Sequence, residues 1–400
     1  MHEFEGKRMR TQIGIVGAGP AGLVLALLLR QRGIEAVVLE TRSRQYVEQR
    51  LRAGVLEHGT VELLNQLGVG DRMQREGLQH HGIELGFNRL RHRIDFDALT
   101  GKSITVYGQH EVVRDLIQAV IERGIPIQFD VGDVGLHGID TEHPCISYTS
   151  DGAAHELDCD FVAGCDGFHG VCRRHVPEGV LTVYEHTYPF GWLGILAQAA
   201  PSRDELVYMH SERGFALFSM RSPSVTRLYL QSRPDEDLAE WPNDRIWEEL
   251  FLRFQCRDGW RPAEGPIISK SVTPLRSFVV EPMQFGRLYL AGDAAHIVPP
   301  TGAKGLNLAV ADVSVLAQGI SARYGKHDAE QLKSYSQRCL RRVWNAQRFS
   351  WRMTSLLHLF EASPFERRRQ IAELDHVTSS TAAAQALAQD YVGLPMPVAL

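Results

Sequence analysis

The chain has 400 residues, 44% of them hydrophobic and 23% charged, and this length predicts two or three domains. A formal net charge of −5 disfavours a general nucleic-acid-binding function, and six cysteines without metal-ligand spacing are expected to be reduced thiols with no bound metal. Residues 1–10 lack the apolar stretch of a signal peptide, and the longest apolar run, residues 21–29, is too short to cross a bilayer. We therefore expect a cytoplasmic protein with neither a nucleic-acid nor a membrane partner.

The first predicted elements are an apolar strand at residues 13–16, a glycine-rich turn and an apolar helix that includes residues 23–29. The turn reads GAGPAG from Gly17 to Gly22, which is the GxGxxG pattern of a dinucleotide site. Gly17 would permit the tight turn, Gly19 would let the backbone approach a pyrophosphate, and Gly22 would allow close helix–strand packing. The phosphates would then meet free N–H groups at the positive end of the helix dipole.

A second strand is predicted at residues 36–39, and it ends in Glu40. An acidic side chain at this place can accept hydrogen bonds from a ribose. The glycine pattern alone could mark only a tight turn. Together with the strand, the helix and the terminal glutamate, it predicts dinucleotide binding.

The elements that follow continue the α/β pattern and then interrupt it. Two helices and four short strands come next, at residues 55–67 and 110–123 and at residues 83–87, 104–107, 125–129 and 161–163. Residues 181–231 alternate aromatic and β-branched residues between glycines, prolines and serines, which predicts antiparallel strands. A helix, a strand and a mostly helical stretch are then expected, at residues 243–254, 287–291 and 302–389.

This order of elements predicts an α/β protein whose Rossmann-like nucleotide-binding domain is discontinuous, with an inserted β-rich domain and a helical C-terminal region. The expected parts are, in chain order, a disordered extension at residues 1–8, the nucleotide-binding domain at 9–180, the β-rich substrate domain at 181–286, a return to the nucleotide-binding domain at 287–325, and a helical region with a subunit interface at 326–400.

Two further motifs point to a flavin. Cys165-Asp166-Gly167 follows the strand at residues 161–163, and Gly292-Asp293-Ala294-Ala295-His296 follows the strand at residues 287–291. With the first glycine motif, they resemble the FAD and NAD(P)H marks of the single-component flavoprotein aromatic hydroxylases. The likeness runs from about residue 9 to residue 395, and its longer stretches resemble the members that act on 4-hydroxybenzoate: residues 50–57, 188–194, 274–282, 292–307 and 391–395.

The resemblance implies an FAD-dependent monooxygenase that forms a homodimer. NAD(P)H would reduce the flavin, O2 would add to it as a C4a-hydroperoxide, and the distal oxygen would pass to the ring carbon next to a phenol. 4-Hydroxybenzoate would become 3,4-dihydroxybenzoate (protocatechuate). Two alternatives stay open: the same chemistry on another hydroxybenzoate or on 3,4-dihydroxybenzoate, and a flavin-binding regulator without turnover.

The resemblance also assigns residues to the substrate pocket. Arg221 matches the carboxylate anchor, and its guanidinium can bind a carboxylate through two parallel hydrogen bonds. Ser219 and Tyr229 match hydroxyl donors that complete the pocket. Without the resemblance, Arg221 would be interpreted as a surface residue of a strand and Tyr229 as part of the core.

A proton relay is expected to activate the phenol. An unperturbed phenol has a pKa near ~10, so about 1% is ionised at pH 8, a deficit of roughly 2.7 kcal/mol. Tyr208 matches the residue that hydrogen-bonds the phenolic oxygen, Tyr391 its relay partner and His80 the solvent end of the relay. The neighbouring His81 is expected at the surface, and the carbonyl of Pro300 is expected to accept a hydrogen bond from the phenol. Such a relay moves a proton outward without admitting bulk water.

Flavin contacts are expected from both ends of the chain. Asp293 could bond ribityl hydroxyls, cap a helix, or do both, while Leu306 and Asn307 would lie in a helical first turn whose dipole stabilises an anionic reduced flavin. The expected FAD contacts are Gly17, Gly19, Ala21, Gly22, Glu40, Arg50, Arg52, Ala53, Gly54, Val55, Gln109, Asp293, Leu306 and Asn307.

The nicotinamide co-substrate is expected to bind transiently in a groove between domains, since the sequence has no second GxGxxG. The matching residues are Arg42, Tyr46, Arg50, Arg52, His169, Arg173 and Arg276. Arg173 and Arg276 could instead be ordinary ion-pair partners. Thr41 stands where NADPH-preferring members have arginine, and Glu48 would sit poorly beside a phosphate. The sequence therefore predicts that NADH is used at least comparably with NADPH.

Overall fold

A six-stranded sheet forms the nucleotide-binding part of the molecule. The computed structural model describes residues 8–50, 52, 54–360 and 363–396. In this sheet five neighbouring strands are parallel, and one short strand joins the edge antiparallel. In spatial order the strands are β19 (Gln284–Phe285), β20 (Leu288–Leu290), β13 (Phe161–Gly164), β2 (Ile13–Val16), β3 (Ala36–Leu39) and β9 (Ile127–Gln128).

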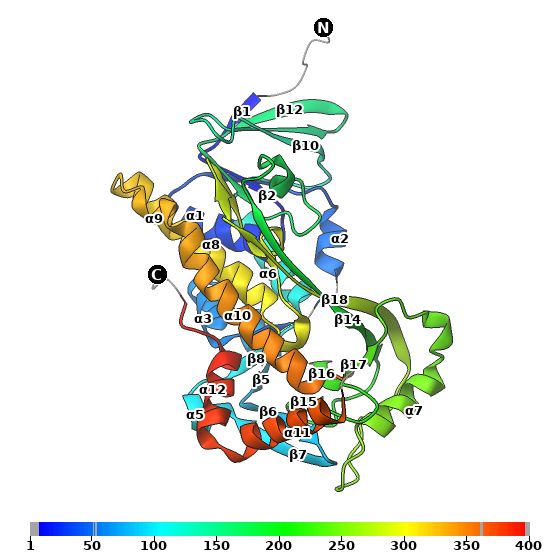
Figure 1. Cartoon of the computed structure of the whole chain (residues 1–400). Coiled ribbons are helices and arrows are strands. Elements are labelled where there is room, and N and C mark those ends of the chain that lie inside the picture. The colour runs from blue at the N-terminus through cyan, green and yellow to red at the C-terminus, as the bar shows by residue number, and fades with distance from the viewer. Residues whose placement is uncertain (1–7, 51, 53, 361–362, 397–400) are drawn as a thin grey trace.

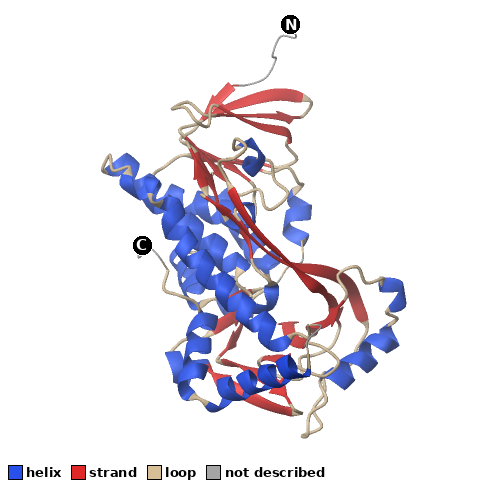
Figure 2. Cartoon of the chain, viewed as in Figure 1, coloured by secondary structure: helices blue, strands red, loops and turns tan. Residues whose placement is uncertain are grey.

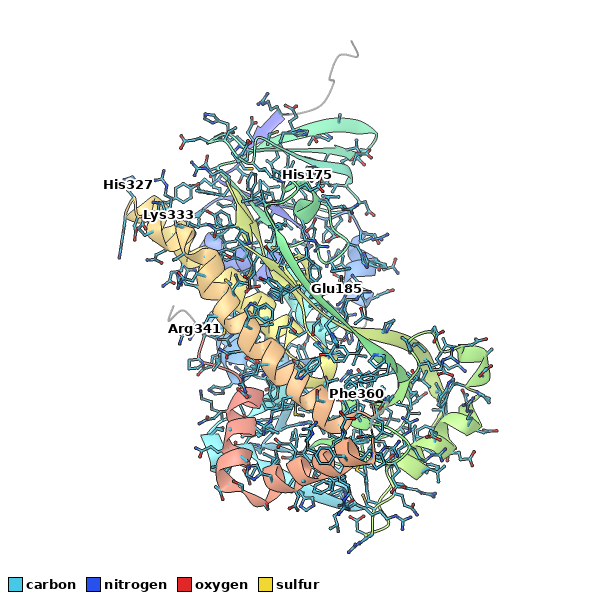
Figure 3. The ribbon with its side chains drawn as sticks, in the orientation of Figure 1. His175, Glu185, His327, Lys333, Arg341 and Phe360 are labelled. Atoms are coloured by element: carbon cyan, nitrogen blue, oxygen red, sulfur yellow. The ribbon has the colours of Figure 1, made fainter. Side chains whose placement is uncertain are left out.

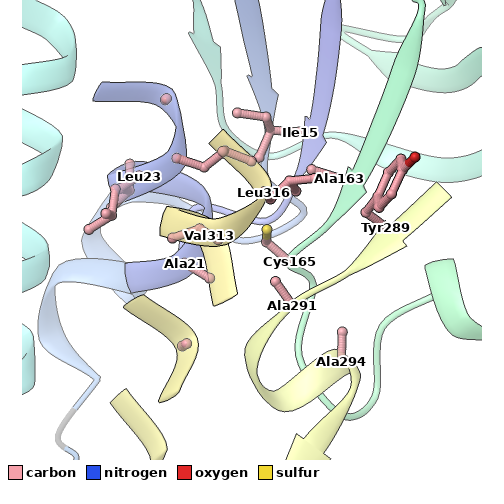
Figure 4. Close-up of a cluster of buried hydrophobic side chains, with 14 of the residues drawn as sticks. Ile15, Ala21, Leu23, Ala163, Cys165, Tyr289, Ala291, Ala294, Val313 and Leu316 are labelled. Atoms are coloured by element: carbon pink, nitrogen blue, oxygen red, sulfur yellow. The ribbon is translucent and has the colours of Figure 1, made fainter. Parts of the chain in front are cut away.

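Three helices pack around this sheet, and their apolar residues make the largest core. α1 (Pro20–Gln31) contacts both α8 (Gly305–Gly325) and α6 (Gln109–Glu122). Figure 4 shows side chains from β2, α1, β13 and α8 gathered in one buried cluster. α8 is long and apolar enough to cross a membrane, but 78% of its most apolar window is buried inside the protein, which is typical of a core helix.

An eight-stranded sheet extends from the nucleotide-binding part to the opposite end of the molecule (Figures 1 and 2). Its two long strands, β14 and β18, lie side by side along this length. The spatial order is β21 (His296–Ile297), β18 (Ile267–Glu281), β14 (Thr182–Ala197), β17 (Val225–Ser232), β16 (Ala216–Ser222), β15 (Leu206–Met209), β6 (Gly82–Phe87) and β7 (Leu90–Asp95).

The two faces of the far half of this sheet are covered by different helices. Side chains of α7 (Asn243–Arg253) share one core with residues such as Val207 and Phe218. Residues that alternate with these, such as Tyr208 and Leu217, share another core with the C-terminal helices. Alternation along a strand therefore decides which side chains face the C-terminal helices. Those helices are α10 (Tyr335–Leu357), α11 (Pro364–Ser379) and α12 (Thr381–Val392), whereas the short α9 (Glu330–Lys333) packs against α8.

Smaller elements complete the fold. A four-stranded sheet has the order β1 (Arg8–Arg10), β12 (Ala153–Asp158), β11 (Cys145–Ser150) and β10 (Gly132–His137), and a three-stranded sheet has the order β4 (Val55–Leu56), β8 (Ile104–Val106) and β5 (Leu78–His80). The remaining helices are α2 (Arg44–Gln49), α3 (His58–Gln66), α4 (Asp71–Glu76) and α5 (Phe96–Thr100), with short 3-10 turns at Cys172–His175, Leu238–Glu240, Gly292–Ala294 and Pro300–Gly302.

The α/β class with its inserted sheet is as expected, and three details differ. The expected helix at residues 55–67 begins as strand β4, because these residues pair with β8. β6 and β7, placed by the sequence in the nucleotide-binding domain, belong to the sheet of the β-rich part, since β6 pairs with β15. Of the expected disordered extension, residues 1–7 lie outside the described residues, whereas Arg8 begins β1 and pairs with β12.

Candidate functional site

The glycine loop after β2 has the geometry of a phosphate-binding turn. Gly17 has φ of +108°, and a side chain there would overlap the backbone of Cys165. A side chain at Gly22 would overlap the carbonyl oxygen of Gly17, so this glycine lets α1 approach the loop. A Cβ at Gly19 would meet nothing within 4 Å, and Gly19 begins α1 without a side-chain cap. The open N-terminus of α1 can therefore receive a phosphate.

Glu40 lies at the end of β3, beside this loop. Its Oε2 accepts a hydrogen bond from the backbone N–H of Ala18 at 2.7 Å, and its Oε1 accepts one from that of Arg42 at 2.8 Å. Each carboxylate oxygen has a further lone pair to offer. The acid is thus held next to the glycine loop, where a ribose hydroxyl would lie.

Three motifs meet at one edge of the six-stranded sheet. The glycine loop follows β2, Asp166-Gly167 follows β13 and Gly292-Asp293 follows β20, and these three strands are parallel neighbours. The carboxyl ends of such strands form the usual ligand crevice of a doubly wound sheet. The fold therefore brings together motifs that are far apart in the sequence.

Asp293 and the N-terminus of α8 form the second side of the crevice. Arg52 Nη1 lies 3.1 Å from Asp293 Oδ2, so two expected FAD contacts pair with each other. The first residue of α8, Gly305, has open space around its Cα, and α8 begins without a side-chain cap. Two uncapped helix N-termini at this edge fit a cofactor that carries a pyrophosphate and an electron-accepting ring.

Asn307 contributes structure through its side chain. Its Oδ1 accepts from the N–H of Glu57 at 2.9 Å, and its Nδ2 donates to the carbonyls of Val55 and Ala303 at 3.0 Å. The amide is buried and engaged on both ends, so only the backbone of Asn307 is left to contact a flavin.

The other expected FAD contacts are placed by the elements that carry them. Ala21 is buried in the first turn of α1, Leu306 follows Gly305 in α8, and Gln109 is the first residue of α6. Gly54 packs against the backbone of Tyr107, where a side chain would overlap it. Arg50 lies at the C-terminal end of α2, and Ala53 lies outside the described residues.

The register of the eight-stranded sheet places the expected substrate residues on one face. Tyr208 pairs with Leu217, and Leu217 pairs with Tyr229 on the next strand. Ser219 and Arg221 lie two and four residues beyond Leu217 on β16, and the register shifts between Met220 and Ser222. Irregularities of this kind redirect side chains.

Arg221 is a half-buried cation whose hydrogen bonds all go to neutral groups. Its Nη1 donates to Ser219 Oγ at 3.2 Å and to the carbonyl of Met220 at 3.0 Å, and its Nη2 donates to Tyr229 Oη at 3.3 Å. Burial lowers the pKa of Arg221, although a guanidinium stays protonated in proteins. Among the described residues no carboxylate lies within ion-pair distance of it. The site has the charge and donors to hold a carboxylate ligand.

Tyr208 and Tyr391 meet as expected. Their hydroxyl oxygens are 2.5 Å apart, and both side chains are buried. Tyr208 also donates to the carbonyl of Thr301 at 3.3 Å, whereas the neighbouring carbonyl of Pro300 accepts from the N–H of Ala303. Burial raises the pKa of both tyrosines, so both hydroxyls stay protonated and can exchange hydrogen-bond roles.

His80, expected at the solvent end of this relay, lies on β5. Its side chain is fully buried, and neither ring nitrogen has a hydrogen-bond partner among the described residues. Burial lowers the pKa of His80 to about 4. β5 pairs with β8, which places His80 opposite Ile104, and the role of His80 at the end of the relay stays a prediction. His81 is the exposed member of the pair and contacts Asp97 at 2.5 Å.

Three expected nicotinamide contacts cluster around Phe168. The guanidinium groups of Arg173 and Arg276 lie 4.9 and 4.8 Å from its ring centre, and the ring of His169 packs against its edge. Arg173 donates to the carbonyls of Phe168 and Ala294, at 2.7 and 2.8 Å. Arg173 thus joins two of the motif loops, while His169 is the exposed residue of the group.

The other expected nicotinamide contacts lie on and beside α2. Arg42 and Arg50 lie 5.3 and 5.9 Å from the ring centre of Tyr46, which is exposed. Arg44 pairs with Glu48 at 2.7 Å, one turn along the helix. Glu48 therefore offsets the charge of Arg44.

Two buried charge clusters near the crevice were missed by sequence reasoning. His296 Nε2 lies 2.6 Å from Asp312 Oδ2, which also accepts from the N–H of Gly292. Glu57 pairs with Lys304 at 2.6 Å. Both pairs join residues from different elements, so no local spacing reveals them. Lys304 is the single charged residue in the stretch 297–311, and this is the one local signal that could have revealed the second pair.

Comparisons with known proteins agree with this geometry. Residues 10–350 match the family described as FAD binding domain. The chain is 48% identical over 392 residues to p-hydroxybenzoate hydroxylase from Acinetobacter baylyi (strain ATCC 33305 / BD413 / ADP1), which covers 98% of this chain and 97% of that one.

More distant proteins share the architecture. The chain is 28% identical over 337 residues to 3-(3-hydroxy-phenyl)propionate/3-hydroxycinnamic acid hydroxylase 2 from Burkholderia vietnamiensis (strain G4 / LMG 22486); the match covers 78% of this chain and only 56% of that longer protein. Among solved structures, p-nitrophenol 4-monooxygenase from Pseudomonas putida DLL-E4 superposes with a TM-score of 0.85 at 19% identity, over 98% of this chain and all of that one. At such low identity the likeness shows a common fold.

Proposed function

The chain belongs to the FAD-binding family of aromatic hydroxylases, and on that premise we propose that it hydroxylates 4-hydroxybenzoate at the 3-position to 3,4-dihydroxybenzoate, with NAD(P)H and O2 as co-substrates. The near full-length likeness to p-hydroxybenzoate hydroxylase supports this substrate. The observation that carries the proposal is Arg221, a half-buried cation without a carboxylate partner among the described residues, on the same sheet face as Tyr208.

Binding begins at the carboxylate end of the substrate. The guanidinium of Arg221 presents a planar set of donors, and Ser219 and Tyr229 place hydroxyls beside it. A carboxylate would neutralise a charge that the protein leaves uncompensated, and charge-assisted hydrogen bonds are the stronger kind. The ring would then lie along the sheet face toward Tyr208.

Activation takes place at the phenol end. The substrate O–H would donate to Tyr208 Oη while Tyr208 donates to Tyr391 Oη. The substrate proton would then pass to Tyr208, the Tyr208 proton to Tyr391, and the Tyr391 proton to water, so that both tyrosines end neutral. Because burial raises the pKa of both tyrosines, neither holds a negative charge, and Tyr208 can return a hydrogen bond to the phenolate. Bound FAD supplies the redox chemistry that activates O2.

Turnover by the purified holoenzyme tests the proposal. NADH or NADPH oxidation is followed with 4-hydroxybenzoate, 3-hydroxybenzoate, 3,4-dihydroxybenzoate or no acid, and products are separated by chromatography. We expect 3,4-dihydroxybenzoate from 4-hydroxybenzoate in near-stoichiometric yield. Coupled hydroxylation of one of the other acids, with only uncoupled oxidation for 4-hydroxybenzoate, would assign the site to that acid.

We further propose that the enzyme is a cytoplasmic homodimer. All six cysteines are free, as is usual in a reducing compartment. Exposed aromatic residues gather where α10 lies beside β14: Trp344 stacks edge-on with Tyr184, and Trp351 lies against His186. Light scattering should give twice the chain mass, and Trp351→Glu should lower it to one chain.

A further inference from the structure

The segment that follows α12 is held by a buried arginine. Arg342 reaches from α10 and donates to the carbonyls of Pro395 at 2.8 Å and Leu394 at 2.9 Å. The same guanidinium lies 3.3 Å from Glu57 Oε2. Only 13% of the Arg342 side chain is exposed, and its contact with Glu57 is partly buried, whereas Leu394 and Pro395 are exposed.

Glu57 connects this arginine to the end of α12. Its second oxygen lies 2.6 Å from Lys304 Nζ, and that ammonium also donates to the carbonyl of Tyr391 at 3.0 Å. Lys304 thus satisfies one of the orphan carbonyls at the C-terminus of α12, where a cation is favoured by the helix dipole. One buried carboxylate is shared by two cations that bind successive parts of the same segment.

The backbone lies directly against Glu57. Gly393 has φ of +94°, and a side chain on it would overlap the Glu57 carboxylate. Further along, a Cβ on Gly59 would come within 2.6 Å of Met396 Cγ. The segment therefore lies closely against Glu57 and Gly59, and a shift toward either is blocked.

We propose that Arg342 is a positioning residue: by binding the Leu394 and Pro395 carbonyls and Glu57, it holds the end of α12 in the place that puts the Tyr391 hydroxyl within hydrogen-bond reach of Tyr208. Tyr391 is the penultimate residue of α12, so a shift of the following segment moves its ring directly. The catalytic consequence rests on the proposed function.

The groups around Tyr391 define what else could change its hydrogen bond. Tyr208 faces it from β15, Lys304 from the start of α8, and the rings of Phe96 and Phe349 pack on it from α5 and α10. On α12 itself, Asp390 pairs with Arg348 at 2.7 Å. Glu57 and Arg342 act on Tyr391 through Lys304 and the backbone.

The test compares Arg342→Gln with Arg341→Gln in the FAD-loaded full chain. Arg341 is the neighbouring, exposed arginine on the outer side of α10 (Figure 3) and is the matched control. Glu57 keeps Lys304 in Arg342→Gln, so no buried carboxylate is left unpaired. Two quantities are measured: amide hydrogen exchange of residues 391–396, and the ionised fraction of bound 4-hydroxybenzoate from its ultraviolet absorbance between pH 6 and 9.

In Arg342→Gln we expect exchange in residues 391–396 to rise by roughly tenfold. The ionised fraction of bound substrate should fall by roughly threefold or more, as for loss of one hydrogen bond. Arg341→Gln should match the parent in both. Gly393→Ala pushes the segment away from Glu57, so it should also raise the exchange and lower the ionised fraction. This variant replaces Arg342→Gln in the test if Arg342→Gln does not fold.

Unchanged ionisation of the bound phenol in a folded Arg342→Gln variant would overturn the proposal, even if exchange rises, because the segment would then not set the relay. A different failure marks the proposed function: the parent protein itself would not bind 4-hydroxybenzoate. In that case only the amide exchange of residues 391–396 tests the positioning role. If exchange in Arg342→Gln is no faster than in Arg341→Gln, the positioning role is refuted.

Discussion

Among single residues, Arg221 carries the charge on which substrate binding is expected to depend. Arg221→Ala should leave FAD binding intact and weaken 4-hydroxybenzoate binding at least about tenfold, because a hydrogen bond to a charged group contributes about 1.5–3 kcal/mol. Flavin absorbance changes on titration with 4-hydroxybenzoate give the dissociation constant.

Two further variants separate charge from geometry. Arg221→Lys keeps the charge but loses the planar pair of donors, so its affinity should lie between those of the parent and Arg221→Ala. Arg233→Ala removes an exposed arginine that pairs only with a nearby surface aspartate, and it should bind like the parent. An Arg221→Ala enzyme with parental affinity would exclude the anchor role.

Tyr208 is the second single residue with a defined role. Tyr208→Phe should still allow NAD(P)H to reduce the flavin, but product per NAD(P)H should fall and hydrogen peroxide should replace it, because the phenol loses its route for the proton. Tyr188→Phe is the matched control, since it removes a buried hydroxyl whose nearest partner, Ser277 Oγ, is 3.4 Å away. Full coupling in Tyr208→Phe would require another way of activating the phenol.

At the scale of an element, α2 should decide the choice of nicotinamide. Glu48 pairs with Arg44 on this exposed helix, so the cation best placed for a 2′-phosphate is already offset. We expect NADH to be used at least comparably with NADPH. Glu48→Gln frees Arg44 and should raise the NADPH-to-NADH ratio of kcat/KM, by up to roughly tenfold for one exposed charge-assisted contact. A parental preference for NADPH above about a hundredfold would contradict this account.

In the folded protein His80 is buried in its neutral form. The free energy of unfolding should therefore depend on pH. The pKa of His80 is lowered to about 4 in the folded state by burial, whereas the unfolded value is near ~6.5. Between these pKa values the unfolded chain binds more protons than the folded protein. The free energy of unfolding is therefore not reduced by His80 above about pH 6.5, and it falls by about 1.4 kcal/mol per pH unit as the pH drops toward 4.

Urea unfolding at pH 7, 6 and 5 measures this term. His80→Asn should be less stable at every pH but should lose less stability than the parent on acidification, since the titrating group is gone. His327→Asn is the control, because His327 is exposed (Figure 3) and asparagine tolerates its positive φ. Equal pH slopes for His80→Asn and the parent would mean that His80 is accessible to protons in the folded protein.

Much of the fold followed from local patterns. The strand at Ile13–Val16, the loop at residues 17–22 and the helix α1 were predicted because glycine spacing and continuous apolar runs act within a few residues. The placement of β6 and β7 was not predicted, because pairing with β15 joins residues more than a hundred positions apart. The burial of His80 was not predicted for a related reason: strand pairing decides which face of β5 is buried.

The sequence by itself determined the cofactor class, because the glycine spacing and the order of strand, turn and helix act locally. Its resemblance to a known family, and no spacing, determined which residues are expected to bind substrate. Only the tertiary structure decided how those residues combine: Arg221 without a carboxylate partner among the described residues, Tyr208 against Tyr391, and Arg342 turned inward onto Glu57. The physical reason is that burial and ion pairing depend on contacts between distant elements. Such contacts produce no regular spacing of residues in the sequence.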